Sequence, residues 1–180
     1  MKKLLLIYLL IPFLGICQDV KLPTDSTGKV IYSGVVSLDS NLSSNELFKR
    51  AKAWFVKEYN SSKDVIQDAD QETHSITGKA LMTAHMTVMG STSDWGHVKY
   101  TVSISCKDGR YRYSISDFYH EIGSYPGLGT IDNNSKSSNV GYREKDYKRV
   151  VNEVNDYSNA LVSSIKDFMS KKLSSASNDW

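Results

Sequence analysis

The stretch that decides the fold is TVSISCKDGRYRYSIS, residues 101–116. Its central Asp108-Gly109 pair is typical of a two-residue type I′ hairpin turn, because aspartate and glycine tolerate the positive φ angles that this turn requires. Apolar and polar side chains alternate on both sides of the turn, so a single register gives one apolar and one polar face. Folding about the turn makes six pairs: Cys106–Tyr111, Ile104–Tyr113, Val102–Ile115, Ser105–Arg112, Ser103–Ser114 and Thr101–Ser116. The sequence therefore predicts two antiparallel strands joined by a tight turn.

Three further strands and two helices are expected around this hairpin. The strands are predicted at residues 29–38, 64–67 and 76–89. Ser43 followed by Glu46 fits a capping box, which opens a helix that ends near Asn60-Ser61-Ser62, and a second helix is predicted over 144–173. Both helices carry an apolar stripe at three- and four-residue spacing. The stripes consist of Leu47, Ala51, Trp54, Phe55 and Tyr59 in the first helix and of Tyr147, Val150, Val154, Tyr157, Leu161, Ile165 and Phe168 in the second.

The order of these elements, β-α-β-β-β-β-α, predicts an α+β fold. We expect an antiparallel five-stranded sheet with two helices packed on one face, which leaves the opposite face open. Residues 120–142 are expected to form a loop, because Pro126, Gly127 and Gly129 lie there. We expect the chain to divide into a signal peptide (1–17), a lead-in segment (18–28), a single domain (29–173) and a flexible tail (174–180).

The N-terminus has the features of a cleaved export signal. Lys2 and Lys3 form a positive segment, residues 4–14 are apolar apart from one proline, and small residues lie near the end. Cleavage is predicted between Cys17 and Gln18. The protein is therefore expected to be exported, either to the periplasm or out of the cell.

Three other interpretations of this segment compete, and one of them, a buried core helix, would need a polar face that the run lacks. A membrane-spanning helix needs about 20 apolar residues, and this run is far shorter, so no transmembrane span is expected in the mature chain. A lipoprotein signal would place lipid on Cys17, but the bulky Ile16 stands before that cysteine. Lipidation of Cys17 thus stays as the less favoured alternative to cleavage between Cys17 and Gln18.

The charge balance argues against nucleic acid as a partner. The full chain has 22 basic and 20 acidic side chains, and the predicted signal carries two of the lysines. The mature chain would therefore be formally neutral, whereas nucleic-acid binders usually carry a basic excess. After cleavage, Cys106 would also lack a partner for an internal disulfide.

Four stretches support a resemblance to a known family. They are the Cys17-Gln18 junction, the strand start Lys29-Val30-Ile31-Tyr32, the helical pair Trp54-Phe55 and the hairpin Lys107-Asp108-Gly109-Arg110-Tyr111. Together with an element order similar to one half of a TATA-box-binding-protein fold, they resemble the TBP-like-fold domain-of-unknown-function family of secreted Bacteroidota proteins. The resemblance covers residues 29–173. It implies the fold, export and an envelope setting, and it supplies no activity and no site residues.

No familiar catalytic or metal-binding motif is present in the sequence. The histidines at 74, 85, 97 and 120 lack the spacing of a metal site, and His120-Glu121 is not followed by a second histidine. Asp68, Asp70 and Glu72 alternate as in a calcium loop, but Thr73 stands where that loop needs glycine. Cys106 is expected to pack in the core. We therefore predict no catalytic residues, no metal and no cofactor.

The residues of interest lie on the predicted open face and near the last hairpin. The candidate surface for a ligand or a partner consists of His85, Lys99, Thr101, Ser103, Arg112, Ser114, Tyr119 and Tyr125, with Lys79 and Thr83 on the same face and Tyr142 as a further rim candidate. Hydroxyl groups and amphipathic tyrosines suit binding surfaces.

Two functional hypotheses follow. The first is a non-catalytic module that binds an envelope protein or a polar ligand, with its oligomeric state open. The alternative is a hydrolase or another enzyme of unrecognised type that uses His85 or His120 with carboxylates beside the 120–142 loop. DNA binding by analogy with the TATA-binding fold is disfavoured, because fold alone does not carry function.

Overall fold

The long strand β5, Arg110–Ile122, pairs with three strands: β4 along one edge, and β1 and β6 along the other. The computed structural model describes residues 20–132 and 144–171. In chain order the elements are β1 Ile31–Ser37, α1 Ser44–Glu58, α2 Ser62–Val65, β2 Ile66–Asp70, β3 Ser75–Val88, β4 Ser91–Lys107, β5 Arg110–Ile122, β6 Tyr125–Thr130 and α3 Glu144–Ser170. The sheet is antiparallel with strand order β1-β5-β4-β3-β2, and β6 pairs with β5 beyond the end of β1.

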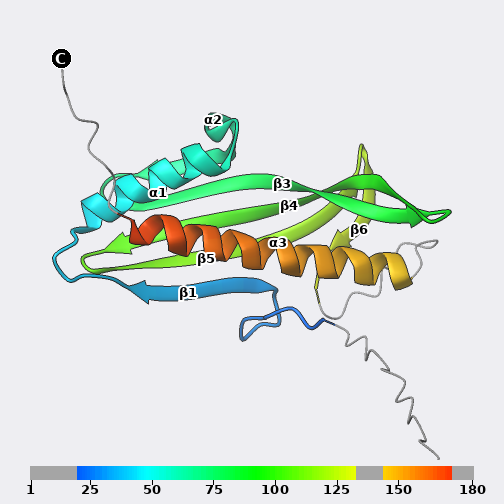
Figure 1. Cartoon of the computed structure of the whole chain (residues 1–180), viewed down its shortest axis with the longest axis horizontal. Coiled ribbons are helices and arrows are strands. Elements are labelled where there is room, and N and C mark those ends of the chain that lie inside the picture. Colours follow the sequence, from blue (N-terminus) through cyan, green and yellow to red (C-terminus); the bar gives the residue numbers. More distant parts are fainter. Residues whose placement is uncertain (1–19, 133–143, 172–180) are drawn as a thin grey trace, which may run out of the picture.

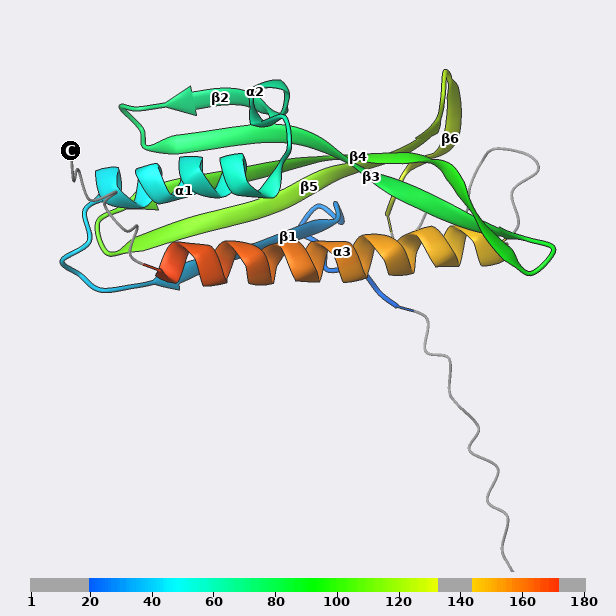
Figure 2. The same ribbon diagram turned by 45° about the horizontal axis from the view of Figure 1, so that its top comes forward.

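Both long helices lie on the same face of this sheet (Figures 1 and 2). The other face is open, as the element order predicts, and the α+β class is confirmed. The core between the layers contains the large side chains Trp54, Phe48, Phe55, Tyr100, Tyr111, Ile104, Ile115 and Ile165. None of the helices within residues 20–132 and 144–171 is long and apolar enough to cross a membrane.

The register of the central hairpin is the predicted one. All six expected pairs are present between β4 and β5, and Gly109 has a φ of +68°. The turn also fixes the start of α1, because the Asp108 carboxylate accepts the backbone N–H of Ser44 at 2.6 Å. The same residue that makes the tight turn thus satisfies one of the free N–H groups at a helix N-terminus.

Helix α1 begins as expected but with half of the predicted capping box. The Ser43 hydroxyl accepts the Glu46 N–H at 3.2 Å. The Glu46 carboxylate turns instead to Arg50 Nε, also at 3.2 Å. Arg50 is only 3% exposed and donates from Nη1 to the carbonyl oxygen of Met169 at 3.0 Å. This residue therefore ties α1 to the last turn of α3.

Two expectations about strands are wrong. The first two of residues 64–67 belong to the short helix α2, so β2 starts only at Ile66. The expected 120–142 loop instead continues β5 to Ile122 and adds β6, so the sheet has six strands and not five. The glycines that suggested a loop are part of this extra strand.

Gly127 explains why β6 can pair there. A Cβ at this position would lie 2.4 Å from Nδ1 of His120, so only glycine lets the backbone of β6 approach the buried ring. The rest of the expected loop, which includes Tyr142, lies outside the described residues. The predicted signal peptide (1–17) and the predicted tail (174–180) lie outside them as well.

The segment before β1 is attached to the sheet edge. Leu22 is buried, Thr24 forms an antiparallel bridge with Val30, and the Ile31 N–H donates to the Pro23 carbonyl at 3.0 Å. The described part of the lead-in thus extends the edge of the sheet beyond β1.

Candidate binding surface

The open face of the sheet carries a band of small hydroxyl side chains. Thr77, Ser103, Ser114 and Ser33 lie opposite one another on β3, β4, β5 and β1. The hydroxyls of Thr77 and Ser103 are 2.9 Å apart and share a hydrogen bond. The middle of the face therefore carries a row of short, polar side chains.

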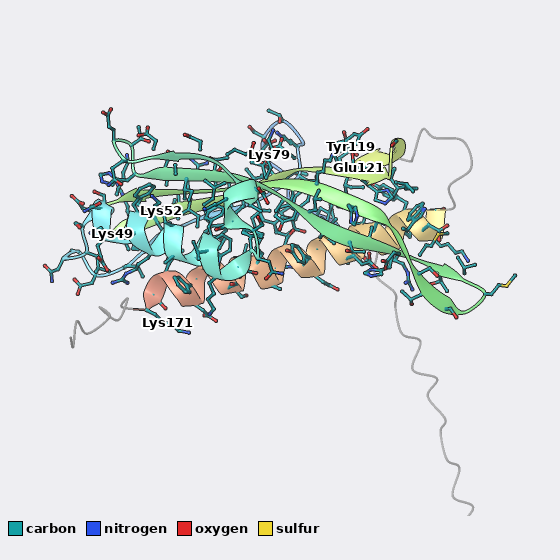
Figure 3. The ribbon with its side chains drawn as sticks, turned by 90° about the horizontal axis from the view of Figure 1, so that it is seen from above. Lys49, Lys52, Lys79, Tyr119, Glu121 and Lys171 are labelled. Atoms are coloured by element: carbon teal, nitrogen blue, oxygen red, sulfur yellow. The ribbon has the colours of Figure 1, made fainter. Side chains whose placement is uncertain are left out.

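Longer side chains flank this band. Lys79 lies opposite Thr101, and Lys99 lies opposite Tyr119. Lys99 forms an ion pair of 2.6 Å with Glu121, and Tyr119 is 39% exposed. In Figure 3, Lys79, Tyr119 and Glu121 lie on the side of the sheet opposite α3. The flanks therefore add cations, a carboxylate and one aromatic ring to the hydroxyl band.

A cavity adjoins this face where the outer edge of β5 changes partners. β1 pairs with β5 as far as Ser116, and β6 pairs with it from Tyr119 onwards. Between them, Asp117 has a φ of +62°, an uncommon conformation for a residue other than glycine. The resulting notch holds an open cavity of about 590 Å³. It is lined by Thr27, Gly28, Lys29, Val30, Asp117, Phe118, Tyr119, Thr130, Ile131 and Asp132.

The notch contains a charged pair. Lys29 Nζ lies 2.6 Å from Asp117 Oδ1, and the Ser116 hydroxyl donates to Oδ2 at 3.0 Å. The hydrogen bond from Lys29 holds the pKa of the Asp117 carboxyl below its usual value, with a further contribution from the hydroxyl of Thr101. The same contact raises the pKa of Lys29. Both groups are therefore charged at neutral pH.

Six of the eight predicted surface residues come together on the open face. They are Lys99, Thr101, Ser103, Arg112, Ser114 and Tyr119. Thr101 and Tyr119 also connect this face to the notch, the first through its bond to Asp117 and the second as part of the cavity wall. Tyr125 lies in β6, opposite Ile122, and therefore on a strand and not in a loop.

His85 is placed differently from the prediction. Its ring Nδ1 lies 3.4 Å from Glu153 Oε1 of α3, and its backbone N–H donates to the other oxygen of that carboxylate at 3.0 Å. The pairing of β3 with β4 shifts between Thr83 and His85. A bulge of this kind increases the local twist of the strands. The far end of β3 thus meets α3, and His85 does not join the open face beside Lys99.

His120 is fully buried and has both ring nitrogens occupied by backbone groups. Leu128 N–H donates to Nδ1 at 2.9 Å, so Nε2 carries the proton and donates to the carbonyl of Trp95 at 2.7 Å. Burial lowers the pKa of this histidine, which favours the neutral ring.

No group of three acidic, histidine or cysteine side chains within residues 20–132 and 144–171 could hold a metal ion. His85 does lie between two carboxylates, with Nε2 3.7 Å from Asp94 and Nδ1 3.4 Å from Glu153. The two carboxylates lie at opposite nitrogens of the ring, so they cannot share one ion with it.

The sequence analysis missed Lys29 and Asp117 as site residues. A signal for the notch was nevertheless present. Buried side chains fall on Tyr111, Tyr113 and Ile115 and then on Phe118 and His120, so the apolar positions shift from odd to even numbers. Such a shift indicates an extra residue in a strand, which is the irregularity that forms the notch.

The antiparallel sheet with both long helices on one face defines a protein of the TBP-like fold. The chain belongs to the family described as a domain of unknown function (DUF4468) with TBP-like fold, whose pattern matches residues 32–121.

Two crystal structures are similar to this chain over most of their own length. A TBP-like protein from Parabacteroides distasonis ATCC 8503 has a TM-score of 0.63 and 22% identity, and the match covers 83% of this chain and 97% of that one. A DUF4468 family protein from Bacteroides ovatus ATCC 8483 has a TM-score of 0.60 and 14% identity, with coverage of 86% and 93%. At these identities the likeness shows the fold alone. No curated protein gives a significant match.

Proposed function

We infer that this protein is an exported, non-catalytic binding module of the cell envelope, and that it binds a partner protein or a polar ligand on its open sheet face. The observation that carries this proposal is the continuity of two features. The hydroxyl band and its flanking charges lead through Thr101 and Tyr119 directly into the notch.

The chemistry of this surface suits a polar occupant. The notch offers an ionised Lys29–Asp117 pair together with the hydroxyls of Thr27 and Tyr119. Ligand sites are concave and contain a few convergent polar groups, and tyrosine is favoured at protein interfaces. An occupant rich in hydroxyl, amide or charged groups would replace the water that these groups bind.

Catalysis by a histidine stays as the alternative hypothesis, and the geometry gives it less support. His120 has no free ring nitrogen, because Trp95 and Leu128 bind both of them. His85 does lie beside carboxylates, but it is not part of the cavity wall. A general base must reach the proton that it removes in a bound substrate.

The location in the envelope rests on the predicted signal of residues 1–17. Mass spectrometry of the mature N-terminus tests it. A chain that begins at Gln18 supports export by cleavage, and a lipid on Cys17 would replace this with membrane anchoring. A chain that keeps Met1 and stays in the cytoplasm would overturn the envelope setting.

The binding function is tested with a photo-crosslinking amino acid placed at Tyr119 in cells. The matched control carries it at Lys52, an exposed position on α1 and thus on the helix side of the molecule. We expect a specific adduct from position 119 alone, which disappears when Thr101→Arg is added. Binding of purified polar ligands is measured in parallel by NMR.

We expect the ligand to change the NMR chemical shifts of Thr101, Asp117 and Tyr119. Adducts of equal yield from positions 119 and 52, together with ligand shifts confined to the helices, would refute the proposed surface. Turnover of a ligand that is abolished by His85→Gln would instead favour the enzymatic alternative.

A further inference from the structure

The outer edge of β1 presents unpaired backbone groups. In this strand, the backbone N–H and C=O groups of even-numbered residues point towards β5. The hydrogen bond from Leu38 N–H to Gly109 O, 2.7 Å long and just beyond the end of the strand, shows this direction. The backbone groups of odd-numbered residues point away from β5, and the Ile31 N–H donates in this direction to the Pro23 carbonyl. The outward groups of Ser33, Val35 and Ser37 have no hydrogen-bond partner in the described part of the chain.

Natural sheets usually protect such edges with charge, proline or a bulge. β2, the opposite edge, has Asp68 and Asp70 and an irregular register. β6 contains Pro126, which has no N–H to offer. β1, in contrast, is seven residues long and reads IYSGVVS, with no charge and no proline. It is therefore the one described edge strand of this sheet without a protective device.

A second copy of the same strand fits this edge particularly well. Two antiparallel β1 strands related by a two-fold axis can pair only outward residues with outward residues. With the axis at Val35, Val35 pairs with its own copy and Ser33 pairs with Ser37. This register uses the three residues with free groups and spares Ile31, whose N–H is occupied.

The side chains agree with this register. Val35 is 62% exposed and points to the open face, where no other described side chain covers it. Pairing about Val35 would bring the two valines into contact, and β-branched cross-strand pairs are favourable. β1 carries no charge, so no like charges meet. The same pairing through β2 would place Asp68 and Asp70 near their own copies.

We propose that two copies of this chain associate through β1, in the antiparallel register centred on Val35. Each copy has one such edge, so assembly stops at a dimer. The two sheets become continuous, and the hydroxyl bands join at Ser33 into one polar surface. The interface is small, so association is weak and depends on protein concentration.

The register is tested by disulfide trapping with the protein purified from expression of the full chain. Residues that form a hydrogen-bonded antiparallel pair have Cα atoms about 5.5 Å apart, which a disulfide can span. We expect Val35→Cys to form a covalent dimer under mild oxidation. An equal mixture of Ser33→Cys and Ser37→Cys should cross-link with each other, while each alone should not.

The matched control is Val56→Cys, because Val56 is 64% exposed but lies on α1. Cys106 does not compete, since it is 3% exposed and burial raises its pKa to about 12. The unmodified protein is oxidised in parallel, which reveals any dimer formed through Cys17. Equal trapping of Val35→Cys and Val56→Cys would overturn the proposal.

Association without a cross-link is measured by sedimentation over a concentration series. Val35→Lys should weaken the dimer at least about 10-fold, because it places like charges opposite each other. Val56→Lys should leave the dissociation constant unchanged, and both variants should keep the circular dichroism of the parent. A parent that stays monomeric at the highest soluble concentration, or a dimer that both variants weaken equally, would refute the β1 interface.

Discussion

Replacing Gly127 by alanine is expected to destabilise the protein through His120. The new Cβ would lie 2.4 Å from Nδ1, 2.8 Å from Cε1 and 3.1 Å from the carbonyl oxygen of His120. The ring cannot simply turn away, because Trp95 and Leu128 hold its two nitrogens at 2.7 and 2.9 Å. Relief therefore requires β6 to separate from β5, or the ring to lose its partners.

Either response breaks at least one buried hydrogen bond. A buried polar group without a partner costs about 1–3 kcal/mol, and both the ring nitrogen and the Leu128 N–H would be affected. Alanine restores about 0.4–1 kcal/mol by restricting the unfolded chain. Two such groups together cost about 2–6 kcal/mol, so we expect a net loss of about 1–5 kcal/mol in the free energy of unfolding, with about 3 kcal/mol as the central value.

Equilibrium urea unfolding followed by circular dichroism measures this loss, and NMR of the imidazole nitrogens reports the tautomer of His120. The control is Gly34→Ala, whose Cβ would meet the hydroxyl end of Tyr113 at 2.8 Å. That side chain can swing aside, so the cost should be nearer 1 kcal/mol. Equal stability of the two variants, with the Nε2-protonated ring unchanged in Gly127→Ala, would refute the argument.

Three other predictions concern buried groups. Burial lowers the pKa of His120, so as the pH falls this histidine is protonated in the unfolded state before it is protonated in the folded state. The free energy of unfolding should therefore decrease below about pH 6.5, by at most about 1.4 kcal/mol per pH unit. His120→Phe should flatten that part of the pH profile of urea unfolding, although its baseline stability is lower. Cys106, whose pKa is raised to about 12 by burial, should react with a thiol reagent at pH 8 only after urea is added. Arg50→Met should lower stability by about 1.5–3 kcal/mol in the same unfolding assay, since it removes the charged bonds to Met169 and Glu46.

The sequence predicted the parts of the fold that depend on local pattern. The hairpin register follows from alternation and from the Asp108-Gly109 turn, and both are properties of neighbouring residues. The stripe on α1 likewise identified Trp54 and Phe55 as core residues. These features need no knowledge of distant contacts, because period and turn chemistry determine them.

What the sequence did not reveal depends on contacts between distant elements. β6 contains Pro126 and two glycines, which are poor strand formers, and it pairs with β5 because Gly127 fits over a ring buried by other strands. His85 was placed on the open face by simple alternation, and the shifted pairing with β4 brings it to α3 instead. Irregularities of register leave only faint traces in a sequence.

The pairing of β1 with β5 has a consequence for how the chain is made. β1 is synthesised early, but the partner of Ile31 is Ser116, far along the chain. At about 5–20 residues per second, several seconds separate the synthesis of these two residues, so β1 lacks its partner strand for at least that long. During that interval β1, which is uncharged and contains two valines, is exposed without its partner strand β5. A holding chaperone that keeps this segment apart from its copies until Ser116 emerges would therefore raise the yield of folded protein.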